Sequence, residues 1–200
     1  MGTVQNILEE WAAGDPKKEE IYVSVPKLAL RWINEAQLRH DSLSEILRTT
    51  WSPTITSTGN IALPSDFLRE IPDRVKWTAT QHLVKIDYPT ANLVESFSGT
   101  YYYSIYGETF YVWEAAAGTP TIPYIKKPTA LTTIATDALE IPTEFHGTLL
   151  IYFDAMYLRK EGDYAGSQVL LRQFDSQAAE DGAKYRSRRD GTMFIRSSLF

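Results

Sequence analysis

Leu139-Glu-Ile-Pro-Thr-Glu-Phe-His146 opens the segment that decides the fold, which continues to Lys184. Thr143 is predicted to cap a helix, because a threonine hydroxyl can accept a hydrogen bond from a free backbone N–H of the first turn. Apolar side chains follow at helical spacing, and they predict a wide stripe that is buried against several neighbours. The stripe comprises Phe145, Leu149, Leu150, Phe153, Met156 and Tyr157.

A second helix is predicted directly behind the first one. Gly162 can end the first helix in a left-handed conformation, which glycine adopts without strain. Asp163 or Ser167 can then cap the next helix. Its inner face would carry Leu170, Leu171, Phe174 and Ala178. Residues 139–183 therefore predict a helical hairpin.

Residues 1–53 are predicted to supply the remaining helices. Thr3–Ala13 has apolar side chains at positions i, i+3, i+4 and i+7, which indicates a short amphipathic helix. The charged residues 15–20 carry both signs and predict a solvated loop. A longer helix is predicted to begin near Ser24 and to end before Trp51.

Residues 54–138 are predicted to form a β-rich insertion. The segment is rich in Thr, Tyr, Val and Ile, which favour strands, and it is interrupted by Gly and Pro, which favour turns. Hairpins are predicted around Gly59-Asn60 and around Gly107-Glu108. Residues 121–126 predict a further strand, at an edge or with a bulge, because Pro123 has no N–H to donate. The predicted fold class is α+β and mainly helical: a helical bundle with a β-rich insertion and an extended C-terminal tail.

That tail, residues 184–200, differs in charge from the rest of the chain. It holds five cations against Asp190 alone, which gives it a local charge of +4. Because the whole chain has a net charge of −5, residues 1–183 carry −9. Apolar side chains among the cations predict a segment that docks on another protein. A frayed terminus with solubilising charges is the alternative. The residues predicted to make the contact are Arg186, Arg188, Arg189, Phe194, Ile195 and Phe200.

The composition excludes several classes of protein. The chain has no cysteine, which excludes disulfides and thiolate chemistry. It has no run of about 18 apolar residues that could span a bilayer, and its N-terminus does not resemble a signal peptide. The negative net charge argues against nucleic-acid binding over the whole surface. A soluble protein made inside a cell, with no membrane partner, is expected.

No catalytic or metal-binding pattern stands out in the sequence. His40, His82 and His146 lie in separate segments, and none has a second ligand at metal-binding spacing. No serine lies in a Gly-x-Ser-x-Gly turn. Lone carboxylates such as Asp66 and Glu108 could serve a glycosidase-like site only if the fold brought them together. We therefore expect no enzymatic activity, no cofactor and no metal.

The tyrosine-rich strands are the second candidate for a binding surface. Alternation along a strand places Tyr101 and Tyr103 on one face and Tyr102 on the other. One interpretation is a core with cross-strand pairs. The others are a partner interface or a sugar-binding platform, because Tyr and Trp combine a large contact area with a polar group. The interface candidates are Tyr101, Tyr103, Tyr106, Tyr111 and Trp113.

Five stretches of the chain follow one another in a recognisable order. They are Arg31-Trp-Ile-Asn-Glu-Ala-Gln37, Leu63-Pro-Ser-Asp-Phe-Leu68, Tyr101-Tyr-Tyr-Ser-Ile-Tyr-Gly-Glu-Thr-Phe-Tyr-Val112, Tyr124-Ile-Lys-Lys-Pro128 and the opening Leu139–His146. In this order they resemble the head-to-tail adaptor (connector) proteins of tailed bacteriophages, in particular those of short-tailed phages. The resemblance covers most of the chain and rests on turns, caps and core positions.

The resemblance implies a structural protein of the virion, located at the head-tail junction and made in the host cytoplasm. It implies a ring of about twelve copies under the portal protein, closed by one repeated interface. Double-stranded DNA would pass through the lumen without specific binding, because an acidic lining does not hold phosphates. Residues 184–200 would contact the portal, and the insertion would contact tail nozzle or tail appendage proteins.

Two other interpretations remain open at this point. One is another tail component, such as a stopper or tail-tube protein, which would assemble without the portal. The other is a cell-wall hydrolase or saccharide-binding module that uses the tyrosine-rich strands. The missing catalytic pattern makes the hydrolase the weaker of the two.

Overall fold

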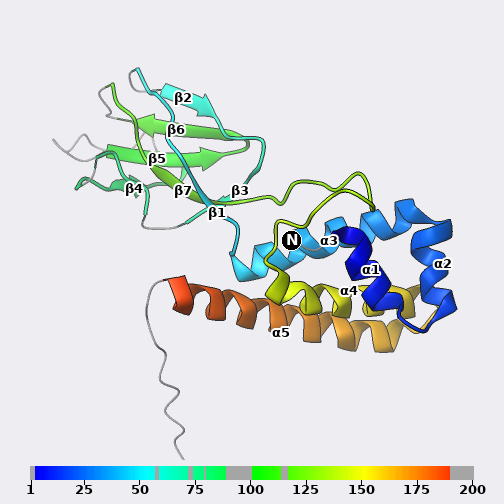
Figure 1. Ribbon diagram of the computed structural model, residues 1–200. Helices are drawn as coiled ribbons and strands as arrows, with labels where there is room; N and C mark the ends of the chain where they lie inside the picture. The colour runs from blue at the N-terminus through cyan, green and yellow to red at the C-terminus, as the bar shows by residue number, and fades with distance from the viewer. Residues whose placement is uncertain are drawn as a thin grey trace, which may run out of the picture. The chain divides into compact units, whose positions relative to one another are not determined.

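The computed structural model describes residues 3–56, 59–71, 74–78, 80–88, 101–113 and 117–189, with only the backbone of Arg189. The chain divides into two compact units (Figure 1). The helical unit comprises Met1–Leu47 and Lys127–Phe200, and the β unit comprises Arg48–Lys126. Within the described residues there are five α-helices and two sheets, so the predicted α+β class is confirmed.

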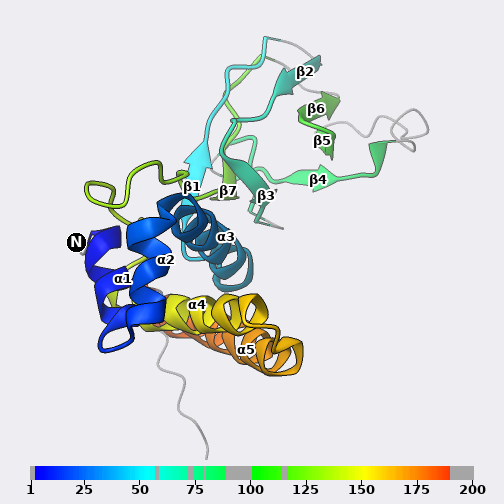
Figure 2. The ribbon, with the colours of Figure 1, turned by 90° about the vertical axis from the view of Figure 1, so that its right-hand side faces the viewer.

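The helical unit is built from both ends of the chain. Its helices are α1 (Val4–Ala12), α2 (Pro16–Ser24), α3 (Pro26–Ser44), α4 (His146–Lys160) and α5 (Tyr164–Arg189), with a 3₁₀ turn, η2 (Thr143–Phe145), before α4. Helices α3, α4 and α5 pack against one another, α1 packs on α4, and α2 contacts both α1 and α3 (Figure 2).

Aromatic rings from three helices fill the centre of this unit. Trp11 of α1 meets Trp32 of α3 edge-on, with ring centroids 6.4 Å apart, and lies 5.3 Å from the Phe153 ring of α4. The indole N–H of Trp11 donates to the Asp154 carboxylate (2.9 Å), which also pairs with the Lys18 ammonium (2.7 Å). The buried N–H is thus satisfied, and α1 and α2 are fixed to α4.

The predicted α4–α5 hairpin is present, although α4 begins differently from the prediction. Gly162 has φ 90° and Asp163 accepts from the Gly166 N–H (2.8 Å), as predicted for the turn between the helices. Thr143 forms no capping bond. The chain instead enters through η2, where the Phe145 N–H donates to the Pro142 carbonyl (3.0 Å) and the Phe145 ring is buried.

The charged connection after α1 is a helix, and its prediction as a loop is wrong. The Asp15 carboxylate accepts from the backbone N–H groups of Lys17 (2.9 Å) and Lys18 (3.4 Å), and Pro16 takes the first helical position. An Asp cap followed by Pro is a strong helix start, even where few residues are apolar. Ile21 is the one buried residue of this helix.

Helix α3 ends earlier than predicted. Glu45 takes a left-handed conformation (φ 57°) at the end of α3, and the Asp41 carboxylate accepts from the Leu47 N–H (2.7 Å). The next residues form a strand, so the β unit begins at Arg48, whereas the sequence predicted a start at residue 54. It ends at Lys126, whereas the predicted end was residue 138.

The β unit contains two sheets. The strands are β1 (Arg48–Trp51), β2 (Gly59–Ala62), β3 (Phe67–Glu70), β4 (Leu83–Lys85), β5 (Tyr101–Tyr106), β6 (Thr109–Trp113) and β7 (Ile122–Lys126). One sheet has the order β1-β7-β3 and is antiparallel. The other has the order β2-β6-β5-β4, with β4 parallel to β5. Their shared core includes Phe110, Val112, Ile122, Val75 and Trp77.

The hairpin predicted around Gly107 is confirmed, and the other strand predictions need correction. Gly107 has φ 59° in the turn between β5 and β6. Gly59-Asn60 is no turn, because both residues lie in β2 and pair with β6. Strand β7 is central and not an edge, with Pro123 opposite Thr50. A single register shift in this sheet lies on β3, where the extra residue is accommodated.

A buried polar cluster joins α3, α4 and α5. The Asp181 carboxylate accepts from the Thr148 hydroxyl (2.6 Å) and the Gln177 amide (3.1 Å), and it lies 3.3 Å from His40 Nε2. His40 is fully buried, and this burial lowers its pKa below the usual 6.5, although Asp181 acts in the opposite direction. Burial lowers the pKa of His146 as well.

The helical unit is therefore expected to lose stability in mild acid. A histidine with a lower pKa in the folded state binds fewer protons there than in the unfolded chain. The free energy of unfolding should fall as the pH drops through about 6.5 and level off below the folded pKa values. Denaturant unfolding followed by circular dichroism at about pH 7.5 and 5.5 measures this difference. The non-titrating variant His40→Gln should lose less stability over that interval; equal midpoints for the wild type at both pH values would contradict the prediction.

Candidate functional site

The C-terminal half of α5 carries the described part of the predicted docking segment. The helix continues to Arg189, so the predicted boundary at Lys184 falls inside a helix. Its continuation is supported by an i,i+4 ion pair between Glu180 and Lys184 (3.4 Å). Phe194, Ile195 and Phe200 lie outside the described residues, as does the side chain of Arg189.

Arg186 fixes this part of α5 to the end of α3. Its guanidinium donates to the Ser44 carbonyl (Nη1 to O, 3.2 Å) and lies 3.5 Å from the Glu45 carboxylate. Ser44 is the last residue of α3, where a cation satisfies a free carbonyl and suits the negative end of the helix dipole. Arg186 thus already has a structural role within the helical unit.

Gly182 allows the close approach that Arg186 secures. A Cβ atom at this position would lie 2.2 Å from the Ser44 carbonyl oxygen and 2.6 Å from its Cα. These are backbone atoms, which cannot turn aside as a flexible side chain can. Helix α5 therefore contacts the end of α3 directly, and only glycine fits between them.

Arg188 has a weaker partner than Arg186. It forms an ion pair with Glu144 (2.7 Å), in which the side chains are 64% and 47% exposed. A solvated pair of this kind contributes about 0–1 kcal/mol, so it can be exchanged for another partner at little cost. Of the described predicted contact residues, Arg188 is the one available to a second protein.

The tyrosine-rich hairpin presents different residues on its two faces. Tyr103 is 2% exposed and packs on Phe110, with ring centroids 5.5 Å apart. Tyr101 packs edge-on against Trp77 at 5.1 Å. Both rings therefore lie on the core side of β5. The five residues predicted as an interface do not form one surface, because these two face the core.

Three of the five predicted interface residues lie together on the other face, beside a tyrosine that the sequence prediction missed. Tyr88 stacks on Tyr106 (centroids 4.9 Å apart, interplanar angle 11°) and lies 4.5 Å from Tyr111. Tyr111 in turn stacks on Trp113 at 6.0 Å. Tyr106 is 61% exposed. We call Tyr88, Tyr106, Tyr111 and Trp113 the aromatic cluster.

The aromatic cluster has the chemistry of a contact surface. Its rings hold one another in fixed positions, so little side-chain entropy is lost when a partner binds. The electrostatic interaction with Tyr111, and the hydrogen bond to it, raise the pKa of the Tyr88 hydroxyl above its ordinary value of 10. Nothing in the sequence around Asp87-Tyr88-Pro89 indicated that Tyr88 would join the hairpin.

Across the described residues, no three His, Asp or Glu side chains gather in a way that could hold a metal ion. His40 and His146 are buried in the helical unit, whereas His82 is exposed in the β unit. None of the helices in the described part of the chain is both long and apolar enough to cross a membrane.

Comparison with known proteins gives a match over almost the whole chain. The sequence model of the family described as SU10 adaptor protein matches residues 2–196. No curated protein sequence matches the chain significantly. The family match confirms the resemblance predicted from the sequence, and it spans both the helical unit and the β unit.

Proposed function

Because the chain belongs to the SU10 adaptor protein family, we propose that it is a structural, non-enzymatic adaptor at the head-to-tail junction of a tailed phage. The observation that carries this proposal is the extent of the match, residues 2–196. An adaptor needs a rigid body with surfaces for partners on either side. The packed helical unit, the separate β unit and the basic C-terminal segment supply these parts.

In this proposal the subunits form a ring of about twelve copies below the portal protein. The helices of the helical unit form a bundle that supplies the contacts between neighbouring subunits.

The charge of the chain supports a passage for DNA through this ring. Residues 1–183 carry −9, so an acidic lining would repel the phosphate backbone and let double-stranded DNA slide through.

The C-terminal segment is the proposed contact with the portal. Arg186 holds α5 on the end of α3, so the end of α5 is a fixed point, and residues 190–200 follow it in the sequence. Arg188 and Arg189 lie at this point, with Phe194, Ile195 and Phe200 following in the sequence. The segment combines charge for the encounter with apolar side chains for a tight contact.

The aromatic cluster is the proposed contact with tail nozzle or tail appendage proteins. Stacked, exposed tyrosines with a neighbouring tryptophan are typical of the centre of a protein interface. The cluster lies in the β unit, which is formed by an insertion between α3 and the residues preceding α4. The two proposed contacts therefore lie in different units.

Mixing the purified protein with its portal ring and measuring the mass by light scattering tests the function. The expected result is a discrete complex that gains about one adaptor subunit for each portal subunit. A protein that stays unbound would contradict the adaptor proposal. Self-assembly, or assembly with tail proteins without the portal, would instead indicate a stopper or tail-tube component.

A further inference from the structure

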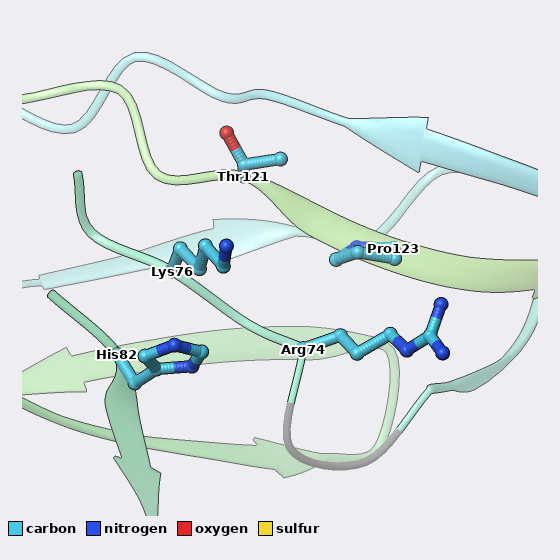
Figure 3. A pocket seen from close by; sticks show the side chains of 5 residues that line it. All are labelled: Arg74, Lys76, His82, Thr121 and Pro123. Carbon is cyan, nitrogen blue, oxygen red and sulfur yellow. The ribbon is translucent and has the colours of Figure 1, made fainter. Parts of the chain in front are cut away.

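A basic pocket in the β unit has no role in the function proposed above. It has a volume of about 410 Å³ and is lined by Arg74, Lys76, His82, Thr121 and Pro123 (Figure 3). We propose that this pocket binds a phosphate group, either on the DNA backbone or on a free phosphate compound. The proposal does not depend on the adaptor function.

Backbone pairing places three of the lining side chains next to one another. Lys76 donates its N–H to the Thr121 carbonyl (2.9 Å) and accepts from the Thr121 N–H (2.7 Å). On its other side, Lys76 forms an antiparallel bridge with His82. Residues paired in this way have their side chains on one face, with Cβ atoms about 4.5–5.5 Å apart. Lys76 therefore lies between His82 and Thr121.

Strand alternation brings the other two residues to the same face. Arg74 precedes Lys76 by two positions, and Pro123 follows Thr121 by two, so each shares the face of its neighbour. The residues between them, Val75 and Ile122, are 1% and 0% exposed and belong to the core. Because the core anchors the opposite face, the five lining residues are held toward the pocket.

Three of the five lining side chains, those of Arg74, Lys76 and His82, carry nitrogen donors. Across the described residues none of these three forms an ion pair with a carboxylate, and no described carboxylate lines the pocket. Arg74 and Lys76 are two cations only two positions apart on one extended segment, so they repel each other and a bound anion would stabilise this arrangement. By contrast, the nearby Lys85 of β4 is paired with Glu70.

The donor set suits phosphate better than a carboxylate. The Arg74 guanidinium can donate two parallel hydrogen bonds, and the Lys76 ammonium adds a point charge. The His82 ring can supply a further donor. Phosphate has oxygens in several directions that can accept from these three groups, whereas a carboxylate has two oxygens in one plane. A volume of about 410 Å³ also falls in the range of small-ligand sites.

Titration of the isotope-labelled full-length protein with inorganic phosphate, followed by backbone NMR, tests the proposal. Amide signals of residues 74–76, 82 and 121 should shift together and saturate. The double variant Arg74→Gln and Lys76→Gln should weaken binding by about tenfold or more, because two charge-assisted hydrogen bonds are lost. Lys27→Gln, which removes an exposed cation on α3, is the matched control and should bind as the wild type does.

A second titration with a short DNA duplex distinguishes the two sources of phosphate. If the duplex shifts the same signals and the double variant loses this response, the ligand is the DNA backbone. If inorganic phosphate binds and the duplex does not, the ligand is a free phosphate compound. The proposal is overturned if neither probe shifts these signals, or if the double variant binds both probes as well as Lys27→Gln does.

Discussion

Alanine in place of Gly182 is expected to lower the free energy of unfolding of the helical unit by about 3 kcal/mol. The added methyl group would lie 2.2 Å from the Ser44 carbonyl oxygen, so α5 must move away from the end of α3. That movement also breaks the bond from Arg186 to the same carbonyl. Denaturant unfolding followed by circular dichroism measures the effect.

Gly147→Ala is the control for this substitution. Gly147 also lies in a helix, but a Cβ there would meet no atom within 4 Å. Alanine has the higher helix propensity, so this variant should keep or raise stability, by up to about 1 kcal/mol. If both variants unfold at the wild-type denaturant concentration, α5 and α3 do not approach each other as closely as described.

Removal of residues 190–200 is expected to abolish portal binding and to leave the helical unit folded. The cut falls after α5, so the contact between Arg186 and Ser44 is retained. A cut at Lys184 would remove that contact, and lost binding could then reflect a loosened helix. Light scattering with the portal ring should show no complex, while circular dichroism should match that of the full-length chain.

Point variants separate the apolar from the charged part of this segment. Replacing Phe194, Ile195 and Phe200 with serine should weaken portal binding strongly, because buried apolar anchors carry most interface energy. Arg196→Gln should act mainly on the association rate and its salt dependence. A truncated chain that binds with the wild-type stoichiometry would disprove the assignment of the segment, although the adaptor function could still hold.

The sequence predicted most of the helical unit because its signals are local. The spacing of Leu149, Phe153 and Met156, the left-handed Gly162 and the Asp163 cap all depend on neighbouring residues. Helix α2 was missed because its sequence, in which four of nine residues are charged, lacks an apolar stripe, although the Asp15-Pro16 cap was visible. The 3₁₀ entry to α4 was missed because it depends on burying Phe145.

The β unit was less predictable because its pairings join distant residues. The hairpin at Gly107 is local and was predicted, whereas β2 pairs with β6 across some fifty residues of sequence. The basic pocket likewise depends on the bridge from Lys76 to Thr121, which lies 45 positions further along the chain. Tyr88 contacts Tyr106 and Tyr111 of the hairpin, 18 and 23 positions further on, and no local signal marks these contacts.

The pairing of β1 with β7 has a consequence for how the protein folds and how it could change. Arg48 lies opposite Ile125, so the chain enters and leaves the β unit on neighbouring antiparallel strands. The insertion closes on itself, and once it has folded, α3 and the residues before α4 are tethered by a short effective loop. The entropy cost of joining the two halves of the helical unit is thereby reduced. The same pair of strands could carry another module, with different partners, without altering the helical unit.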